Sequence, residues 1–228
     1  TRSLITFGTP YRGSLNAVGY LANGYAKGIG PLKVDLSETV RSFTSIYQLL
    51  PTFECVDSGS GQLVRVGETS GLPNIDAARA AKALALHHEI RDAQKRNAAD
   101  EAYRKDGYKI FPIVGIEQPT FVSAVLRNGK LELSQSFKGK VMGGDSVVPR
   151  VSATPVELSD QHREVYAAEA HASLQAPGRS LAGSSSSQVV SHAGGSVVVQ
   201  ADATSAARRE AVMVMRMDST MERGERRR

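Results

Sequence analysis

Cysteine is almost absent from this 228-residue chain: Cys55 is the only one, which excludes an internal disulfide framework and any metal site built from several cysteines. Tryptophan is missing, and no apolar run approaches the ~18 residues that would span a bilayer. A strong charge of one sign is also lacking, because residues 208–228, with seven Arg and four acidic residues, hold three of the five net positive charges. A nucleic-acid surface normally clusters Lys and Arg with stacking aromatics, so we expect no nucleic-acid partner.

What remains is the composition of a globular domain, 41% hydrophobic and 22% charged. The length suits one core, at roughly 100 to 200 residues per domain. We expect one partial domain over 1–179 and a low-complexity linker or disordered tail over 180–228, which contains a serine run. The chain starts without Met and enters a β-rich segment at once, so we expect the natural N-terminus, with any signal peptide, to lie upstream. The sequence therefore does not indicate the cellular compartment.

The first third of the chain predicts a strand followed by two helices. Residues 4–7 are apolar and β-favouring and stop at a turn beginning with Gly8, which is typical of a buried central strand. Ser14 can cap a helix over 14–26. Asp35, with Glu38 three residues later, resembles a capping box for a second helix that ends before Pro51.

The middle of the chain predicts a loop, a long helix and further strands. Residues 52–75 are rich in Gly, Ser, Thr and Pro without a period, which indicates a long loop. An Ala-rich, charged segment over 76–104 favours a helix, with Gly107 placed to end it. In a strand over 108–115, Pro112 cannot donate a ladder hydrogen bond, which predicts an edge position or a bulge. Residues 121–137 predict a hairpin, because Asn128-Gly129 tolerates the positive φ angles of a type I′ turn.

Two short segments carry candidate chemistry. Asp145 follows two glycines and precedes an apolar pair and a proline, and His171 stands 26 residues later. A carboxylate that orients an imidazole, which then moves a nucleophile's proton, forms the acid and base of a triad; in α/β-hydrolases Ser, Asp and His follow in that order. On local sequence alone, the favoured interpretation of Asp145 is a turn aspartate whose side chain bonds its own backbone. His162 is the alternative base, but its charged run is typical of a solvated face.

Four motifs occur in order along the chain, over residues 5–14 (ITFGTPYRGS), 45–51 (SIYQLLP), 144–149 (GDSVVP) and at His171. Together they resemble bacterial lecithin:cholesterol acyltransferase-like proteins, over residues 3–175. The resemblance implies the α/β class, specifically the C-terminal part of an α/β-hydrolase fold: a mostly parallel sheet flanked by helices, with a cap insertion. It also implies that Asp145 is the triad acid and His171 the base. Val147 departs from the family, which more often has a hydroxyl residue there.

The nucleophile of that family is missing from the chain, because no Gly-x-Ser-x-Gly motif occurs in it. Ser146 and Ser196 come near, but Val stands where the second Gly of the motif should be. We therefore expect the chain to be a fragment, with the nucleophile and the oxyanion-hole amides upstream of Thr1, and the fragment by itself to be inactive. The family's activity implies an acyl-enzyme formed from a lipid ester, with an alcohol or water as acceptor, which makes the parent an O-acyltransferase, lipase or esterase.

The candidate cap covers residues 11–75. Its aromatic side chains could line an acyl-chain groove, although core packing explains each of them equally well; they are Tyr11, Tyr20, Tyr25, Phe43 and Tyr47. We expect no cofactor and no metal, since His87 and His88 are adjacent on a helix and point about 100° apart. The expected partners are the lipid ester and its acceptor, with no membrane span and at most transient contact with a membrane surface. The alternative is a non-catalytic interaction module with a degenerate hydrolase fold.

Overall fold

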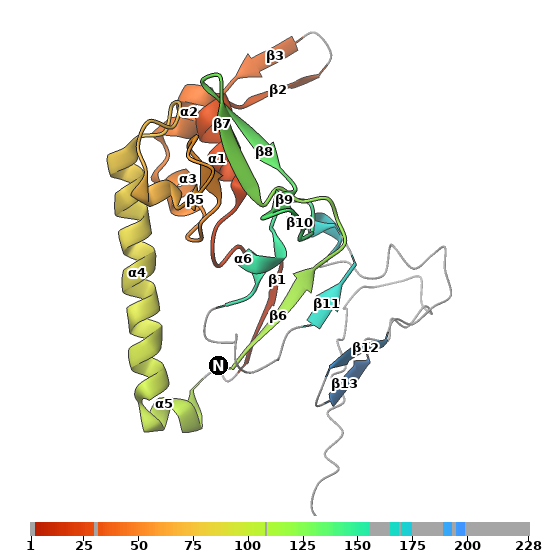
Figure 1. Ribbon diagram of the computed structural model, residues 1–228. Helices are drawn as coiled ribbons and strands as arrows, with labels where there is room; N and C mark the ends of the chain where they lie inside the picture. The colour runs from red at the N-terminus through yellow and green to blue at the C-terminus, as the bar shows by residue number, and fades with distance from the viewer. Residues whose placement is uncertain are drawn as a thin grey trace, which may run out of the picture. The chain divides into compact units, whose positions relative to one another are not determined.

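The structure is a computed structural model that describes residues 3–29, 32–107, 109–155, 165–168, 170–174, 189–192 and 195–198. By its internal contacts the chain divides into two units, residues 1–175 and 176–228. The first unit combines helices with a parallel sheet and a mixed sheet, so the chain belongs to the α/β class (Figure 1). The alternating strands and helices of the sequence produce this class, because each apolar face must be buried against another element.

Three parallel strands form the sheet that positions the candidate site. They are β1 (Ser3–Phe7), β6 (Lys109–Gly115) and β11 (Val165–Ala167), in the order β1-β6-β11. The register pairs Phe7 with Ile113 and Ala167 with Gly115. Because all three run the same way, the segments that leave their carboxyl ends emerge at one edge of the sheet.

Two predictions about strand position are wrong for the described sheet. β1 was expected in the centre but is an edge strand of the described sheet, and Leu4 and Ile5 are exposed. β6 holds the central place despite Pro112. Gly8 donates to the Ile113 carbonyl on the β1 side, so the neighbouring Pro112 nitrogen faces the β11 side. There the described pairing begins only at Ile113, so no ladder hydrogen bond is lost among the described residues.

A second, mixed sheet has the strand order β5 (Leu63–Val64), β4 (Val56–Asp57), β7 (Ser123–Arg127) and β8 (Lys130–Ser134). The predicted hairpin is confirmed: β7 and β8 are joined at Asn128 and Gly129, with φ angles of 50° and 75°. The expected loop over 52–75 instead contains β4, β5 and a short 3-10 helix, η1 (Val66–Glu68). These strands are too short to show a sequence period, which is why the pattern suggested a loop.

The predicted first helix is α1 (Leu15–Asn23), and Ser14 caps it by accepting a hydrogen bond from the Asn16 backbone N–H. It ends early at Gly24 (φ 90°), and a hairpin follows, formed by β2 (Ala26–Ile29) and β3 (Leu32–Asp35). The second predicted helix is two short ones, α2 (Ser37–Ser42) and α3 (Thr44–Gln48), separated by an extended Phe43. The predicted capping box is wrong, because Asp35 accepts from Ser37, and Glu38 pairs with Arg41.

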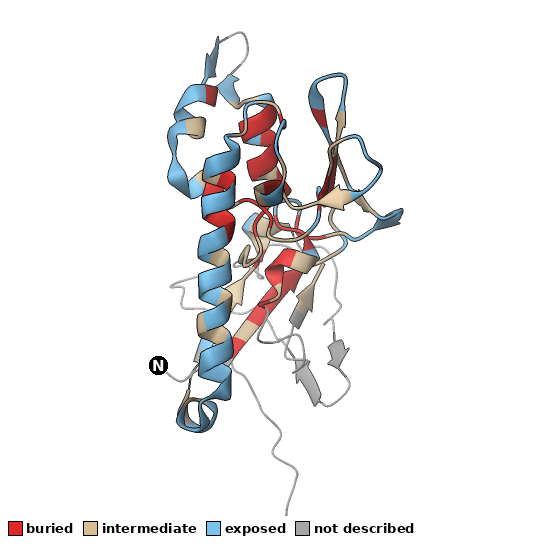
Figure 2. Cartoon of the chain, turned by 60° about the vertical axis from the view of Figure 1, so that its left-hand side comes forward, coloured by how far each residue is buried: buried red, intermediate tan, exposed pale blue. Residues whose placement is uncertain are grey.

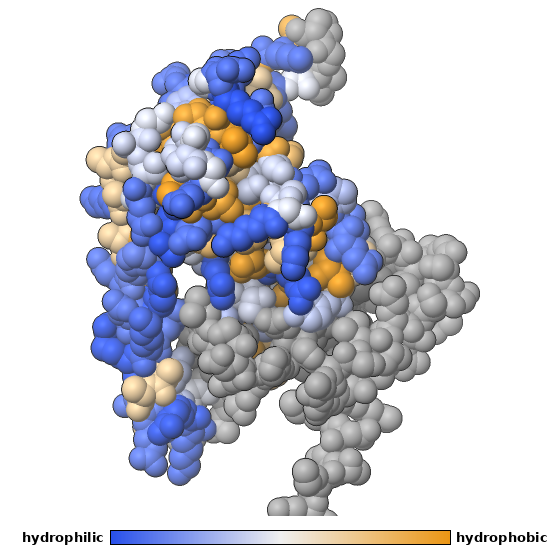
Figure 3. All heavy atoms as spheres, in the orientation of Figure 1, coloured by the Kyte–Doolittle hydropathy of each residue, from blue (hydrophilic) through white to orange (hydrophobic). Residues whose placement is uncertain are grey.

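The predicted long helix is α4 (Ala77–Ala99), which Asp76 caps, followed after Asp100 by α5 (Glu101–Asp106). Gly107 ends α5, as the sequence predicts. Only the N-terminal half of α4 has buried residues, and the rest of the helix lies largely exposed (Figure 2). The side of α4 and α5 seen in Figure 3 is correspondingly hydrophilic.

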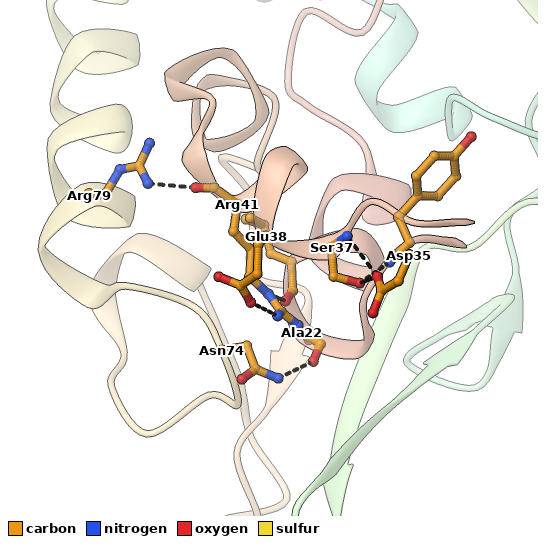
Figure 4. Close-up of polar contacts among 9 residues, drawn as sticks. Ala22, Asp35, Ser37, Glu38, Arg41, Asn74 and Arg79 are labelled. Carbon is orange, nitrogen blue, oxygen red and sulfur yellow. Dashed lines mark hydrogen bonds and ion pairs between the residues drawn. The ribbon is translucent and has the colours of Figure 1, made fainter. Parts of the chain in front are cut away.

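The larger core joins residues from the expected cap with residues beyond it. Leu15, Val18, Leu21, Tyr47 and Val56 pack in one cluster with members from α4, β7 and β8, namely Ala80, Ala83, Ala124 and Leu131. Polar contacts also join residues 11–75 to α4 and to one another (Figure 4): Arg79 donates to the Arg41 carbonyl, and Asn74 donates to the Ala22 carbonyl. Residues 11–75 therefore share their core with α4 and the β7–β8 hairpin.

The remaining elements are short. In the first unit they are β9 (Ser136–Phe137), β10 (Lys140–Val141), α6 (Arg150–Ala153) and the 3-10 helix η3 (His171–Ser173). In the second unit, within the expected linker or tail, the structure describes an antiparallel pair, β12 (Val189–His192) and β13 (Gly195–Val198). Among the described residues, no helix combines the length and the apolar character needed to cross a membrane.

Candidate active site

The carboxyl edge of the parallel sheet brings together three residues that are distant in sequence. Gly8 directly follows β1, and His171 follows β11 at the start of η3. Asp145 lies in the loop before α6, and a bridge from Gln118 to Gly144 ties that loop to the segment leaving β6. Each of the three neighbouring strands thus contributes to one small region of the fold.

Asp145 and His171 form a direct hydrogen-bonded pair. His171 Nδ1 lies 2.7 Å from Asp145 Oδ2, and the His171 backbone N–H donates to the Asp145 carbonyl, also at 2.7 Å. The Asp145 side chain is only 1% exposed, whereas that of His171 is 40% exposed. With a carboxylate accepting at Nδ1, this nitrogen carries the proton and Nε2 presents its lone pair. We call the two residues the Asp145–His171 dyad.

The loop around Asp145 also satisfies the other carboxylate oxygen. Oδ1 accepts hydrogen bonds from the backbone N–H groups of Val147 (3.0 Å) and Val148 (2.7 Å). The turn-aspartate interpretation and the pairing with His171 are therefore both correct descriptions of one side chain. Every partner of the carboxylate among these contacts is a donor, and this arrangement compensates a buried, ionised acid for the water it loses.

Gly8 leaves the space that the dyad occupies. Its φ is 52°, and a Cβ placed there would clash with Asp145 Oδ2 and lie 2.9 Å from His171 Nδ1. The same atom would be 2.8 Å from Leu174 Cδ1. Only glycine combines this backbone conformation with such a close approach. The turn after β1 therefore packs directly against the side chains of Asp145 and His171.

Two buried serines connect the segment after β1 to the loop that holds Asp145 and to α6, which follows that loop. Ser14 Oγ donates to the Val147 carbonyl at 2.8 Å while it caps α1. Ser152 Oγ donates to the Gly13 carbonyl at 2.5 Å and accepts from the Arg12 backbone N–H at 3.1 Å. A third hydroxyl, on Thr120, accepts from the Ser146 backbone N–H at 2.9 Å.

The sequence did not single out Thr120 or Ser152, and it identified Ser14 as a helix cap and as the last residue of the first motif. The contacts of Ser152 and Thr120 with these loops join residues 26 to 140 positions apart. A single serine or threonine in such a contact leaves no periodic or spaced pattern along the chain. No signal in one sequence could have found them.

The imidazole of His171 is partly exposed, with 40% of its side-chain surface open to solvent. Among the described residues, the pairing with Asp145 is the only hydrogen bond of the imidazole ring. A partly exposed imidazole whose Nδ1 is held by a buried carboxylate can take a proton from a hydroxyl at its other nitrogen and return it to a leaving group. The rival base, His162, lies outside the described residues.

The two near-miss serines do not occupy a nucleophile elbow. Ser146 is exposed directly after Asp145 with φ 79°, in a loop that leads to Pro149 and α6. Ser196 lies within β13 of the second unit. The family's elbow is a sharp turn between a strand and a helix, and neither residue has that context.

The five candidate substrate residues lie in different surroundings. Tyr11 donates to Thr6 Oγ1 of β1 at 3.0 Å. Tyr20 and Tyr25 contact each other edge to face, with ring centroids 4.9 Å apart, and Phe43 is exposed between α2 and α3. Tyr47 is buried in the larger core beneath the guanidinium of Arg79. A substrate role for them stays a prediction, and Tyr47 already has a packing role.

A groove of about 700 Å³ lies elsewhere, over the second sheet and the β9–β10 turn. Polar residues line much of it, including Glu54, Asp57, Ser134 and Lys138. Neither member of the dyad lines it. The groove therefore offers no acyl-chain site next to the dyad.

No family profile matches the chain, and no curated protein is significantly similar to it in sequence.

Proposed function

We propose that this chain carries the acid and the general base of a serine-dependent acyl-transfer enzyme that acts on lipid esters, either an O-acyltransferase or a lipase or esterase. The observation that carries the proposal is the Asp145–His171 hydrogen bond of 2.7 Å at the carboxyl edge of a parallel sheet, with the His171 side chain 40% exposed. The substrate class rests on the family resemblance of the four motifs. The nucleophilic serine would come from a segment upstream of Thr1.

In this mechanism His171 Nε2 takes the proton of the serine hydroxyl as its oxygen attacks the ester carbonyl carbon. The proton then passes from Nε2 to the departing alcohol, which leaves an acyl-serine. Water or an acceptor alcohol attacks this ester with the same proton transfers and frees the serine. Asp145 holds the ring through Nδ1 and stabilises the imidazolium that forms in each half-reaction.

The test is the hydrolysis of a short-chain aryl ester by the full-length protein and by variants of the dyad. Asp145→Asn and His171→Ala should each lower kcat by about 10³- to 10⁴-fold, as is typical of triad members. His88→Ala is the matched control, because His88 is an exposed histidine of α4, and it should leave kcat unchanged. Near-normal turnover by His171→Ala would show that the dyad is not the acid and base.

The upstream coding sequence gives an independent test. A Gly-x-Ser-x-Gly elbow encoded there would support the proposal, and an elbow without serine would contradict it, in favour of a non-catalytic module. Residues 1–228 alone should not react with an active-site-directed fluorophosphonate. Labelling of this chain at a serine would place the nucleophile elsewhere than proposed.

A further inference from the structure

Asp145, the candidate acid, lies at the carboxyl end of β6 but is distant from that strand in the sequence. β6 ends at Gly115, and residues 121–142 intervene before the loop of Asp145. This insertion forms β7, β8, β9 and β10, of which β7 and β8 pair into the second sheet, where β8 packs beside α1 (Figure 1). The loop that holds Asp145 therefore does not follow β6 directly in the sequence. Tertiary contacts must hold the loop at the end of that strand.

The segment that leaves β6 supplies those contacts. Gln118 donates its backbone N–H to the Gly144 carbonyl at 3.1 Å. Two residues later the Thr120 hydroxyl donates to the Gln118 carbonyl at 2.9 Å and accepts from the Ser146 backbone N–H at 2.9 Å. Thr120 is 2% exposed, so water does not readily replace either bond. The two attachments hold Gly144 and Ser146, the residues on either side of Asp145.

The backbone of the acid loop needs such an attachment. Ser146 has φ 79°, a left-handed conformation that residues other than glycine seldom adopt and that persists only when the surroundings enforce it. The Ser146 backbone N–H donates the hydrogen bond that Thr120 Oγ1 accepts. If this bond were lost, the residue could relax to negative φ. The adjoining Asp145 carboxylate would then turn away from His171.

We propose that Thr120 is a positioning residue of the Asp145–His171 dyad: its hydroxyl connects the end of β6 to the acid loop across the insertion at 121–142. This inference rests on the proposed function, since it assigns Thr120 a role in that same site. The Thr120 side chain makes no hydrogen bond with Asp145 or His171 and acts through the backbone of Ser146.

The experiment compares Thr120→Val with Thr120→Ser in the full-length protein. Val keeps the shape and removes the hydroxyl, whereas Ser keeps the hydroxyl and removes the methyl group. Thr120→Val should lower kcat for a short-chain aryl ester by about 10- to 100-fold with KM nearly unchanged, as displacements of about 1 Å do. Thr120→Ser should retain kcat to within about threefold, because it keeps the hydrogen bond. Thr69→Val is the control for the same substitution at a threonine outside the site.

A spectroscopic readout separates positioning from general destabilisation. The hydrogen-bonded Nδ1–H of His171 should give an imidazole proton resonance that disappears in His171→Ala. It should be lost or broadened in Thr120→Val at a temperature where the variant is folded, and kept in Thr120→Ser. Thr120→Ala is measured beside Thr120→Val, so that one hydroxyl-free variant remains if the other does not fold.

A second substitution tests the route through Ser146. Glycine adopts positive φ without strain, so Ser146→Gly added to Thr120→Val should recover part of the lost kcat. Normal kcat and a normal imidazole resonance in Thr120→Val, with His171→Ala inactive, would overturn the role of Thr120 and leave the proposed function standing. Full activity of His171→Ala would overturn the proposed function itself, and the imidazole resonance alone would then report whether Thr120 positions the pair.

Discussion

Gly8→Ala tests the geometry of the site without reference to any activity. The added Cβ meets Asp145 Oδ2, His171 Nδ1 and Leu174 Cδ1, the last two at 2.9 and 2.8 Å. A left-handed conformation costs an alanine about 1 to 2 kcal/mol. Overpacking of a filled site adds about 1 to 3 kcal/mol. We therefore expect Gly8→Ala to lower the free energy of unfolding by roughly 2 to 5 kcal/mol.

The matched control is Gly129→Ala in the β7–β8 turn. Gly129 has φ 75°, but a Cβ there would meet nothing within 4 Å. It should therefore lose only the backbone part, about 1 to 2 kcal/mol. The difference between the two variants isolates the clash with the dyad.

Urea unfolding followed by circular dichroism measures both free energies, provided that the slopes agree. Equal losses for Gly8→Ala and Gly129→Ala, within about 0.5 kcal/mol, would refute the close approach of Gly8 to the dyad. A double-mutant cycle with Asp145→Ala adds a further check. The cost of Gly8→Ala should fall in that background, because the carboxylate it clashes with is gone.

Two further predictions concern groups outside the site. Burial raises the pKa of the Cys55 thiol, so DTNB should react with it only after the protein unfolds, and reaction of the native protein at the rate of the denatured chain would contradict its burial. Hydrogen bonds from the Ser37 hydroxyl and backbone N–H lower the pKa of Asp35 below 3.8, so its contribution to stability is present above that pH and is lost as the pH falls through the lowered pKa. The difference in unfolding free energy between the wild type and Asp35→Asn should accordingly vanish in strong acid, and a difference that grows there would show that the sign is wrong.

Local chemistry determined much of the secondary structure. Asn128-Gly129 produced a two-residue hairpin turn because both residues accept positive φ, and Ser14 capped α1 because its hydroxyl can reach a free backbone N–H. Gly107 ended the helical segment that begins after Asp76. These outcomes depend on neighbours a few residues away, so one sequence was enough to predict them.

Strand order and the support of the dyad depended on contacts between distant segments. Pro112 predicted an edge position or a bulge, yet β6 is central. The proline is tolerated there because its nitrogen faces the β11 side, where the described pairing begins only at Ile113. The motifs selected Asp145 and His171, but tertiary structure alone placed Oδ2 2.7 Å from Nδ1, with Gly8 beneath and Thr120 holding the loop. These hydrogen bonds join residues 26 positions apart in the sequence. Many serines, threonines and backbone amides could donate or accept such bonds, so no local pattern in the sequence predicts which of them do.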